Sequence, residues 1–411
     1  MSIICMRYMN TINNMFYCLL LLLATACSAP QSAGPDIRHI DVGEAFGTHT
    51  QVKLSDYAAG IDYVPLETHP DALMIGTDHI GMKSYGDKLY FYYHSPLFMV
   101  PKFTPLCFSS KGEFLFKIGS IGRSKNDLMY AKDLIINEYT DEIVVPDYNL
   151  FHFFSLDGEL KRNVEVLHND LKFEAYCVND NSYAFIRAIQ IDEKDTKNRL
   201  YTIDSCGILA HRMNFARLSA LAFDRILNKT LSQSKGSVLY QSDTILHLYT
   251  PKDTIYTLDL KSGRYPKMKP LYKVDYGNYG RTDYWGASLA IRSHSLIETQ
   301  SMVMLEVMFP YWRYPDIDHK YRWSCFVYDK NSARTYHLQY DETYGFAGFT
   351  NDLDGGMPFY PTYMNDGKMY RLVDAVDFIE FAQMGNSARM KEVASKLTDD
   401  SNPVLVVVSL K

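Results

Sequence analysis

The sequence has 411 residues, of which 47% are hydrophobic and 22% are charged, and its formal net charge is −6. This composition is typical of a folded globular protein, and the negative charge argues against a general nucleic-acid binder. Beyond the N-terminal region, no apolar stretch is long enough to cross a membrane as a helix. We therefore expect a globular body whose partners are neutral, or carry a charge that matches a local part of its surface.

The chain begins with an apolar run of the kind found in export signals. It extends from Met15 to Leu23 and ends in Ala24-Thr25-Ala26-Cys27. The run is too short for a permanent transmembrane helix, and small residues before a cysteine suit a peptidase that cuts in front of a lipidated Cys. We expect residues 1–26 to be a lipoprotein signal peptide and Cys27 to carry lipid. The alternative is an ordinary secretory signal with an incidental Cys27, and in both cases the chain leaves the cytoplasm.

The residue after the predicted lipid site indicates which membrane a lipoprotein is exported to. Ser28, rather than Asp, follows Cys27, which is compatible with export to the outer membrane. We therefore expect an outer-membrane lipoprotein, on the periplasmic or the cell-surface side, that contacts the membrane through its N-terminal lipid. Removal of residues 1–26 takes away one Arg and no acid, so the formal charge changes from −6 to −7. No sequence pattern specifies a membrane leaflet or an oligomeric state.

Two regions follow the signal. Residues 27–58 are rich in small and polar residues with little periodicity, which predicts a flexible tether. Over residues 59–411, short segments rich in Tyr, Phe, Val, Ile and Leu alternate with turn signals, which predicts strands. A strand followed by Asp or Ser and a tight turn with Gly or Asn recurs five times, for example over residues 151–160. A hairpin repeated in this way is the mark of a propeller blade.

The repeats predict an all-β fold, a six-bladed β-propeller over residues 59–411. The sixth blade would come from both ends of the chain, with Ile61–Leu66 joining Met369–Val373 and Val404–Val408, so that no sheet edge stays open. One short C-terminal helix is expected between Ser387 and Leu397, with Met390 on the face that covers the last blade. The five complete blades lie near residues 75–121, 130–168, 171–216, 236–276 and 293–341.

Four motifs occur in a characteristic order: Pro65-Leu66-Glu67-Thr68, then Lys117-Ile118-Gly119 with Gly122-Arg123, then Asn351–Gly356 with Pro358–Pro361, and finally Asn402–Leu405. In this order the chain resembles, over residues 60–411, the large family of six-bladed β-propeller lipoproteins from Gram-negative gut bacteria. One departure is Ser124–Leu128, where that family tends to have Gly-Pro-Gly-Glu-Tyr. The family is largely uncharacterised, so the resemblance implies a fold and an anchor but no chemistry.

No pattern predicts a cofactor or a metal site. Cys107, Cys177, Cys206 and Cys325 have no CxxC spacing, and we expect separate buried thiols, with a Cys177–Cys206 disulfide as the alternative. The histidines are scattered without an HExxH motif. Asn351–Gly356 has alternating acidic oxygens as calcium loops do, but Pro361 stands where such a loop needs Glu, so we expect a structural turn.

The candidate ligand site is one mouth of the propeller channel. Loops from the second to the third strand of a blade, and from the fourth strand to the next blade, open at the same mouth. In the fifth blade these loops are residues 310–321 and 276–285, and they should be neighbours. Their rings, guanidinium groups and carboxylates suit a sugar ring or an acidic group, and the alternative is that they pack the loops onto the blade. The candidates are Arg123, Arg281, Tyr284, Trp285, Trp312, Arg313, Tyr314, Asp316, Asp318 and His319.

Two function classes fit these residues. The favoured one is a membrane-anchored extracytoplasmic binding module that captures a glycan, a peptide or a partner protein at the mouth. The alternative is a glycan-active hydrolase or lyase that uses carboxylates, or Arg and Tyr, in the same funnel, with Asp316, Asp318 and His319 as the first catalytic candidates. Binding is favoured because no complete acid and base set, metal cluster or nucleophile elbow can be named in the sequence.

Overall fold

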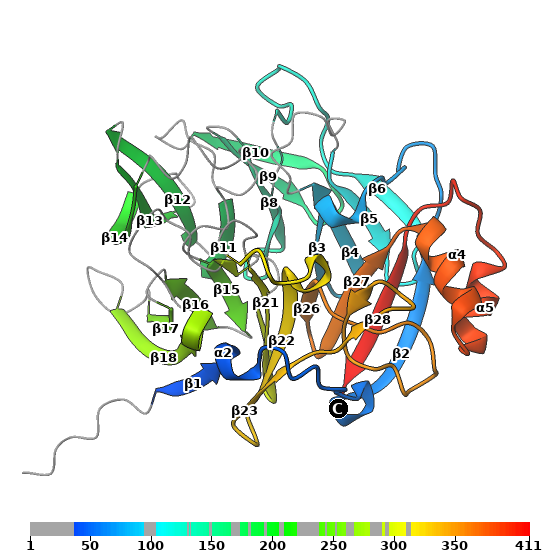
Figure 1. Ribbon diagram of the computed structural model, residues 1–411. Coiled ribbons are helices and arrows are strands. Elements are labelled where there is room, and N and C mark those ends of the chain that lie inside the picture. Colours follow the sequence, from blue (N-terminus) through cyan, green and yellow to red (C-terminus); the bar gives the residue numbers. More distant parts are fainter. Residues whose placement is uncertain are drawn as a thin grey trace, which may run out of the picture. The chain divides into compact units, whose positions relative to one another are not determined.

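A computed structural model of the chain is shown in Figure 1. The structure describes residues 37–411 with internal gaps, and Arg38–Lys411 forms one compact unit. The residues outside the description are 1–36, 94–103, 130, 132, 148–149, 166–172, 180–181, 193–194, 205–208, 220–237, 243–244, 251–252, 260–266, 280–289, 292–295 and 310–313.

Consecutive antiparallel strands, each set from one stretch of chain, make up most of five sheets. The first contains β3 (Ile80–Tyr85), β4 (Lys88–Tyr93), β5 (Leu106–Ser109) and β6 (Phe114–Lys117). The second contains β7 (Ile135–Asn137), β8 (Glu142–Pro146), β9 (Leu150–Ser155) and β10 (Leu160–Glu165). The third contains β11 (Phe173–Asn179), β12 (Ser182–Asp192), β13 (Asp195–Asp204) and β14 (Leu209–Ser219).

The fourth and fifth sheets follow the same meander with additions. The fourth contains β15 (Val238–Ser242), β16 (Ile245–Thr250), β17 (Thr254–Asp259) and β18 (Lys267–Asp275). The fifth contains β21 (Met302–Met308), β22 (Trp323–Asp329) and β23 (Arg334–His337), with β19 (Ala290–Ile291) and β20 (Ile297–Glu298) both paired to β21. These five sheets correspond to the five complete blades that the sequence predicts.

Strands from both ends of the chain meet in one further four-stranded sheet. It consists of β26 (Tyr363–Asn365), β27 (Lys368–Val373), β28 (Val404–Leu410) and β2 (Ala58–Pro65), in that order. We call it the composite sheet. β2 pairs antiparallel with β28, as the sequence predicts. A separate two-stranded sheet is formed by β24 (Tyr340–Asp341) and β25 (Phe346–Ala347).

The first strands of the sheets lie next to one another. β3 contacts both β26 and β7, β7 contacts β11, β11 contacts β15, and β15 contacts β20. Apolar side chains, many of them from the middle strands, fill the space between neighbouring sheets, and one core cluster combines Met304 of the fifth sheet with Val406 of the composite sheet. Sheets arranged in this way, each with its first strand innermost, form a β-propeller.

Equivalent turns join the third and fourth strands of successive blades. In the first two sheets the turn reads Ser-x-x-Gly-Glu, and Gly112 and Gly158 have φ values of 87° and 85°. The hydroxyl oxygens of Ser109 and Ser155 accept backbone N–H groups two and four residues further on. A left-handed conformation is easy for glycine, and the serine satisfies the exposed N–H groups, so each turn is encoded locally.

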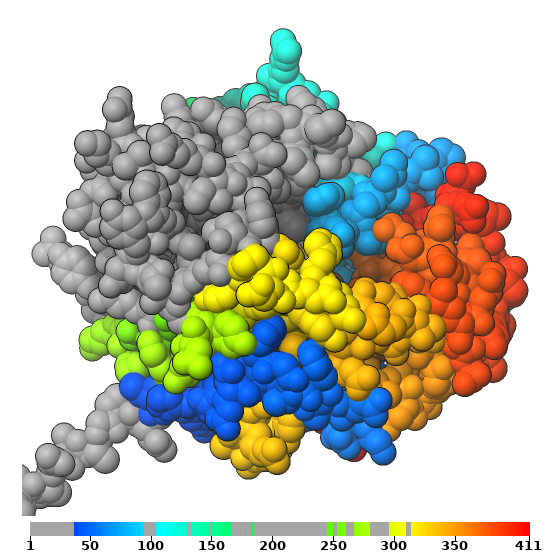
Figure 2. Space-filling model, in the orientation of Figure 1, coloured from blue at the N-terminus to red at the C-terminus, as the bar shows by residue number. Residues whose placement is uncertain are grey.

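The segment after Ile37 belongs to the fold. β1 (Arg38–Asp41) pairs in parallel with β18, α2 (Val42–Ala45) follows, and η1 (Leu54–Asp56) leads into β2. In the space-filling view this segment, in dark blue, lies on the surface beside the yellow-green atoms of β18 (Figure 2). The predicted tether over 27–58 is therefore wrong from Arg38 onward. Its elements are too short to show periodicity, but Ile40, Val42 and Leu54 are fully buried.

Two helices connect β27 to β28. The predicted one is α5 (Ala388–Ala394), where Met390 is fully buried and Val393, Ala394 and Leu397 pack against the same core. The other, α4 (Ala375–Met384), adds a helix to the single one that the sequence analysis expects.

Single turns of 3-10 helix occur at η2 (Thr77–His79), η4 (Gly277–Tyr279) and η6 (His319–Tyr321). Among the described residues, no helix has both the length and the apolar character needed to cross a membrane.

Candidate functional site

The two loops predicted to be neighbours do meet. Tyr314, between β21 and β22, donates its hydroxyl to the carbonyl oxygen of Tyr279 at 2.7 Å, and their ring centroids are 5.6 Å apart. Tyr279 lies in η4, directly after the fourth strand of the preceding sheet. The loop from the second to the third strand and the loop between blades therefore come together at one mouth, as the strand order requires.

A phenylalanine of the N-terminal segment packs against aromatic rings at this junction. The Phe46 ring lies 4.3 Å from the ring of Phe309 and 5.0 Å from that of Tyr279, and Tyr314 packs against the same cluster. Tyr314 is half-buried, and its ring contacts with Phe309 and Tyr279 hold the loop onto the blade. For this one candidate, the packing interpretation left open by the sequence describes the ring.

The acidic candidates belong to the next turn of the loop. Asp316, Asp318 and His319 are exposed. The Asp318 carboxylate accepts the backbone N–H of Lys320 at 3.3 Å, which caps η6, and Lys320 forms an ion pair with Glu342. Asp318 therefore stabilises the turn, a role that needs only its oxygen as an acceptor.

Arg123 lies in the connection from the first to the second sheet. Its turn is held by the Asp127 carboxylate, which accepts the Ser124 N–H at 2.9 Å and the Ser120 hydroxyl at 2.8 Å. These hydrogen bonds keep the pKa of Asp127 below its usual value. Arg123 itself is exposed on this ordered turn. The remaining candidates, Arg281, Tyr284, Trp285, Trp312 and Arg313, and the predicted lipid site Cys27, lie outside the described residues.

The Asn351–Gly356 segment is a structural turn, as predicted. One Asp354 carboxylate oxygen accepts hydrogen bonds from the side-chain amide of Asn351, the N–H of Gly356 and the Tyr63 hydroxyl. The other accepts the hydroxyl of Ser387, whose oxygen also caps α5. Protein donors therefore occupy the oxygens that a cation would need.

A buried polar cluster joins the fourth and fifth sheets. Glu298 accepts hydroxyls from Tyr240 at 2.8 Å and Tyr272 at 2.7 Å, and its carboxylate lies 2.6 Å from the Lys330 ammonium. Burial alone would raise the pKa of Glu298, but the hydrogen bond and charge of Lys330 outweigh burial and lower it. His247 stacks on Tyr240, and burial lowers the pKa of its ring. The carboxylate has its partners inside the protein, and the two tyrosine hydroxyls that it accepts connect the fourth sheet to the fifth.

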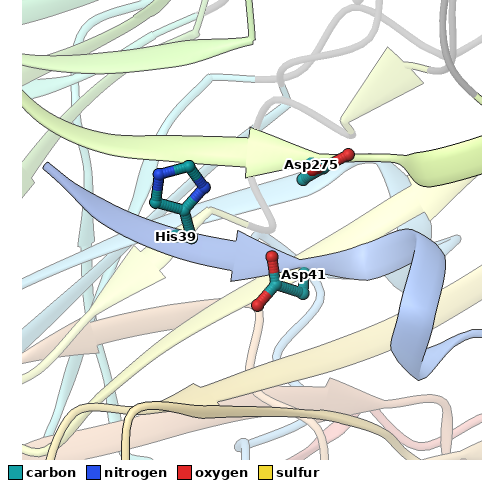
Figure 3. Close-up of side chains that lie close together, drawn as sticks. All are labelled: His39, Asp41 and Asp275. Carbon is teal, nitrogen blue, oxygen red and sulfur yellow. The ribbon is translucent and has the colours of Figure 1, made fainter.

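A second group of possible ligands lies at the outer edge of the fourth sheet. His39 and Asp41 of β1 and Asp275 of β18 offer one nitrogen and two carboxylates whose ligand atoms lie within 4.8 Å of one another (Figure 3). The sequence analysis, which expects no metal site, misses this group because Asp275 is more than two hundred residues away in the sequence. The only local signal is the spacing of His39 and Asp41, two residues apart on one strand face.

Comparisons with known proteins show the fold and the family. A family described as a domain of unknown function, DUF4934, matches residues 37–409. A Bacteroides fragilis protein described as exported has a solved structure with a TM-score of 0.58 and 14% identity, covering 91% of this chain and 99% of its own. A member of the DUF4221 family from Bacteroides vulgatus gives a TM-score of 0.44 and 10% identity, covering 86% and 97%. A comparison with curated proteins gives no match.

Proposed function

We propose that this chain, which belongs to the DUF4934 family, is an exported binding module that captures a ligand at the mouth of its propeller. The apolar run before Cys27, and the similarity to a Bacteroides fragilis protein described as exported, support a location outside the cytoplasm. Lipidation of Cys27 would attach the module to the outer membrane, on its periplasmic or cell-surface side.

We also propose that the composite sheet is a blade, which makes the propeller six-bladed. The turn at Gly158 of the second sheet packs on the end of β6, so that a Cβ there would lie 2.7 Å from the Phe116 ring. The turn at Gly112 of the first sheet packs in the same way on the end of β2, where a Cβ would lie 2.2 Å from the Pro65 carbonyl oxygen. In both cases a turn of one sheet packs on the end of the last strand of its neighbour. This equivalence supports a position for the composite sheet next to the first sheet in the ring of blades.

The hydrogen bond from Tyr314 to Tyr279 is the observation that carries the ligand site. It joins the two loops whose sequences contain Arg281, Tyr284, Trp285, Trp312 and Arg313. Aromatic faces stack on sugar rings, and guanidinium groups bind hydroxyls or carboxylates, so a glycan with acidic groups is the first ligand class to test. A peptide or a partner protein would use the same residue types.

Binding has more support than catalysis. Of the catalytic candidates, Asp318 caps η6 and lies 4.0 Å from the Lys320 ammonium, which ties it to the turn. A hydrolase would need two carboxylates on either side of a scissile bond, and a carboxylate that caps a turn is not positioned for that role by the contacts it makes. The hydrolase or lyase alternative therefore stays a prediction from sequence.

The test is a glycan and peptide binding screen followed by three variants. Trp312→Ala and Trp285→Ala should each weaken binding of the identified ligand by about fivefold or more, since a stacked ring contributes on the order of 1 kcal/mol. The matched control is Tyr139→Ala, because Tyr139 is 58% exposed in the turn between the first two strands of a blade, at the opposite end from the mouth. Equal binding by all three variants would contradict a ligand site at the mouth.

A further inference from the structure

The pairing of β1 with β18 decides which side chains share the outer face of the fourth sheet. The strands are parallel, with Ile40 opposite Val274, and both of these residues are buried in the core. Side chains alternate along a strand, so the neighbouring positions point away from that core. His39 stands opposite Lys273, and Asp41 stands opposite Asp275.

These positions bring two carboxylates into direct opposition on one sheet face. Like charges directly opposite each other in a sheet are destabilising. Asp275 and His39 are exposed and Asp41 is half-buried, so the group is accessible to solvent. The ligand atoms of the three side chains lie within 4.8 Å of one another, and ligands on one tetrahedral ion are about 3.4 Å apart, since the bonds are about 2.0–2.2 Å long. Small side-chain rotations close that difference.

The backbone keeps the two carboxylates together. A Cβ at Gly43 would lie 2.3 Å from the carbonyl carbon of Tyr276, so the chain after Asp41 lies directly against the chain after Asp275. The N–H of Asp41 donates to the hydroxyl of Thr335 at 2.9 Å. The Asp275 carboxylate accepts the N–H of Gly277 at 2.8 Å, which fixes its orientation. The repulsion therefore cannot be relieved by strand separation, and a cation between the carboxylates would relieve it.

We propose that His39, Asp41 and Asp275 bind a divalent transition-metal ion of the zinc class and thereby fasten the N-terminal strand to the fourth sheet. Calcium and magnesium prefer all-oxygen sites, whereas an imidazole nitrogen with two carboxylates suits zinc. Three protein ligands leave a further position for water. The ion would bridge β1 and β18, which are paired over only four residues.

Lys273 is the competing source of positive charge on this face, because it lies opposite His39 and two residues before Asp275. An ammonium close to the carboxylates would oppose a divalent cation. The variant Lys273→Ala therefore separates the two explanations. If the site takes a metal, removal of Lys273 should leave zinc affinity unchanged or increase it. If Lys273 is what neutralises the carboxylates, the parent should not bind zinc, and removal of Lys273 should destabilise the protein.

The experiment is titration calorimetry of the purified protein, without a polyhistidine tag, with zinc chloride at pH 7.5. We expect one site, a rise in melting temperature on zinc addition, and at least tenfold weaker binding in His39→Ala and in Asp275→Asn. Asp400→Asn, at an exposed acid outside the group, is the matched control and should bind as the parent does. No binding by the parent, or equal affinity in the parent and Asp275→Asn, would overturn the proposal.

Discussion

The ammonium of Lys330 lies 2.6 Å from the carboxylate of Glu298, and both side chains are largely buried where the fourth and fifth sheets meet. Lys330 comes from the turn after β22, and Glu298 from β20 of the same sheet, while Tyr240 and Tyr272 reach the carboxylate from the neighbouring sheet. The charge pair lies within the fifth sheet, and the two tyrosine hydroxyls connect its carboxylate to the fourth.

Removal of the lysine charge should therefore destabilise the protein strongly. We expect Lys330→Met to lower the free energy of unfolding by about 3 kcal/mol or more, because it leaves a buried carboxylate with neutral partners only. The double variant Glu298→Gln with Lys330→Met should recover much of this loss. Urea denaturation of the parent, both single variants and the double variant gives the coupling energy. A Lys330→Met protein as stable as the parent would show that the pair contributes nothing.

Three turn glycines form a graded series. Gly86, Gly112 and Gly158 all have positive φ, so alanine costs about 1–2 kcal/mol at each from the backbone alone. At Gly86 a Cβ meets nothing within 4 Å, at Gly158 it meets the Phe116 ring at 2.7 Å, and at Gly112 it meets the Pro65 carbonyl at 2.2 Å. A half-buried ring can move more easily than a backbone carbonyl. We expect the losses in free energy of unfolding to rise from Gly86→Ala through Gly158→Ala to Gly112→Ala, with more than about 3 kcal/mol at the last.

Denaturant titrations of these three alanine variants measure the series directly. The comparison also tests the junction between β2 and the first sheet, because the steric term at Gly112 exists only if the composite sheet lies where Pro65 contacts that turn. Equal losses at Gly86 and Gly112 would mean that this junction is loose in solution.

The features predictable from sequence are those encoded locally. The blade hairpins could be predicted because Ser109 and Gly112, or Ser155 and Gly158, define their own turns within five residues. The helix α5 has its signal in the spacing of Met390, Val393, Ala394 and Leu397. The helix α4 has the same kind of signal, since Ala375, Phe378 and Ala382 are its buried positions, and the sequence analysis overlooked it.

Other features depend on contacts between distant parts of the chain. β1 has four residues, too few to show an alternation, and its partner β18 begins at Lys267. Its assignment to a tether is therefore an error that no local pattern corrects. The grouping of Asp275 with His39 and Asp41 has the same origin, because only the register of two parallel strands brings the three together. In contrast, the meeting of the two mouth loops follows from blade topology alone.

Lipidation predicts a simple change in fractionation. Replacement Cys27→Ser removes the thiol that would carry lipid, so the protein should move from the membrane fraction to the soluble fraction of cells that express it. The control is Cys18→Ser, which lies before the predicted cleavage point and should leave the protein with the membrane. Immunoblots of separated membrane and soluble fractions report the outcome. Full membrane association of the Cys27→Ser protein would rule out the lipoprotein anchor.

Loss of the last strand should abolish cooperative folding. β28 pairs with β2 on one side and β27 on the other, and its Val404, Val406 and Val408 are fully buried. Deletion of residues 403–411 removes these side chains and leaves two strand edges without partners, which costs far more than the roughly 0.5 kcal/mol of a dispensable surface segment. Deletion of residues 59–67 should have the same effect. Calorimetric melts test this, and a cooperative transition at the parent temperature in either deletion would contradict closure by the composite sheet.

His337 links stability to pH through the N-terminal segment. Its Nδ1 accepts the N–H of Gly47 at 3.0 Å, its ring stacks on Phe326 at 4.9 Å, and His49 lies 4.8 Å away. Burial, together with the charge of His49, lowers the pKa of His337 to about 3. The native imidazole therefore stays neutral at pH values where the unfolded chain binds a proton. Stability from this group is complete above the unfolded pKa of about 6.5 and falls as the pH drops from there toward 3.

Between pH 7.5 and pH 5 this histidine should lower the free energy of unfolding by about 2 kcal/mol. In His337→Asn the side-chain oxygen can accept the Gly47 N–H but cannot titrate, so the variant should lose less stability over the same interval. Some slope will remain from His247, whose pKa burial also lowers. Urea denaturation at both pH values measures the difference. An unchanged slope in His337→Asn would show that the ring is protonated in the native protein at pH 5, and that the N-terminal segment does not bury it in solution.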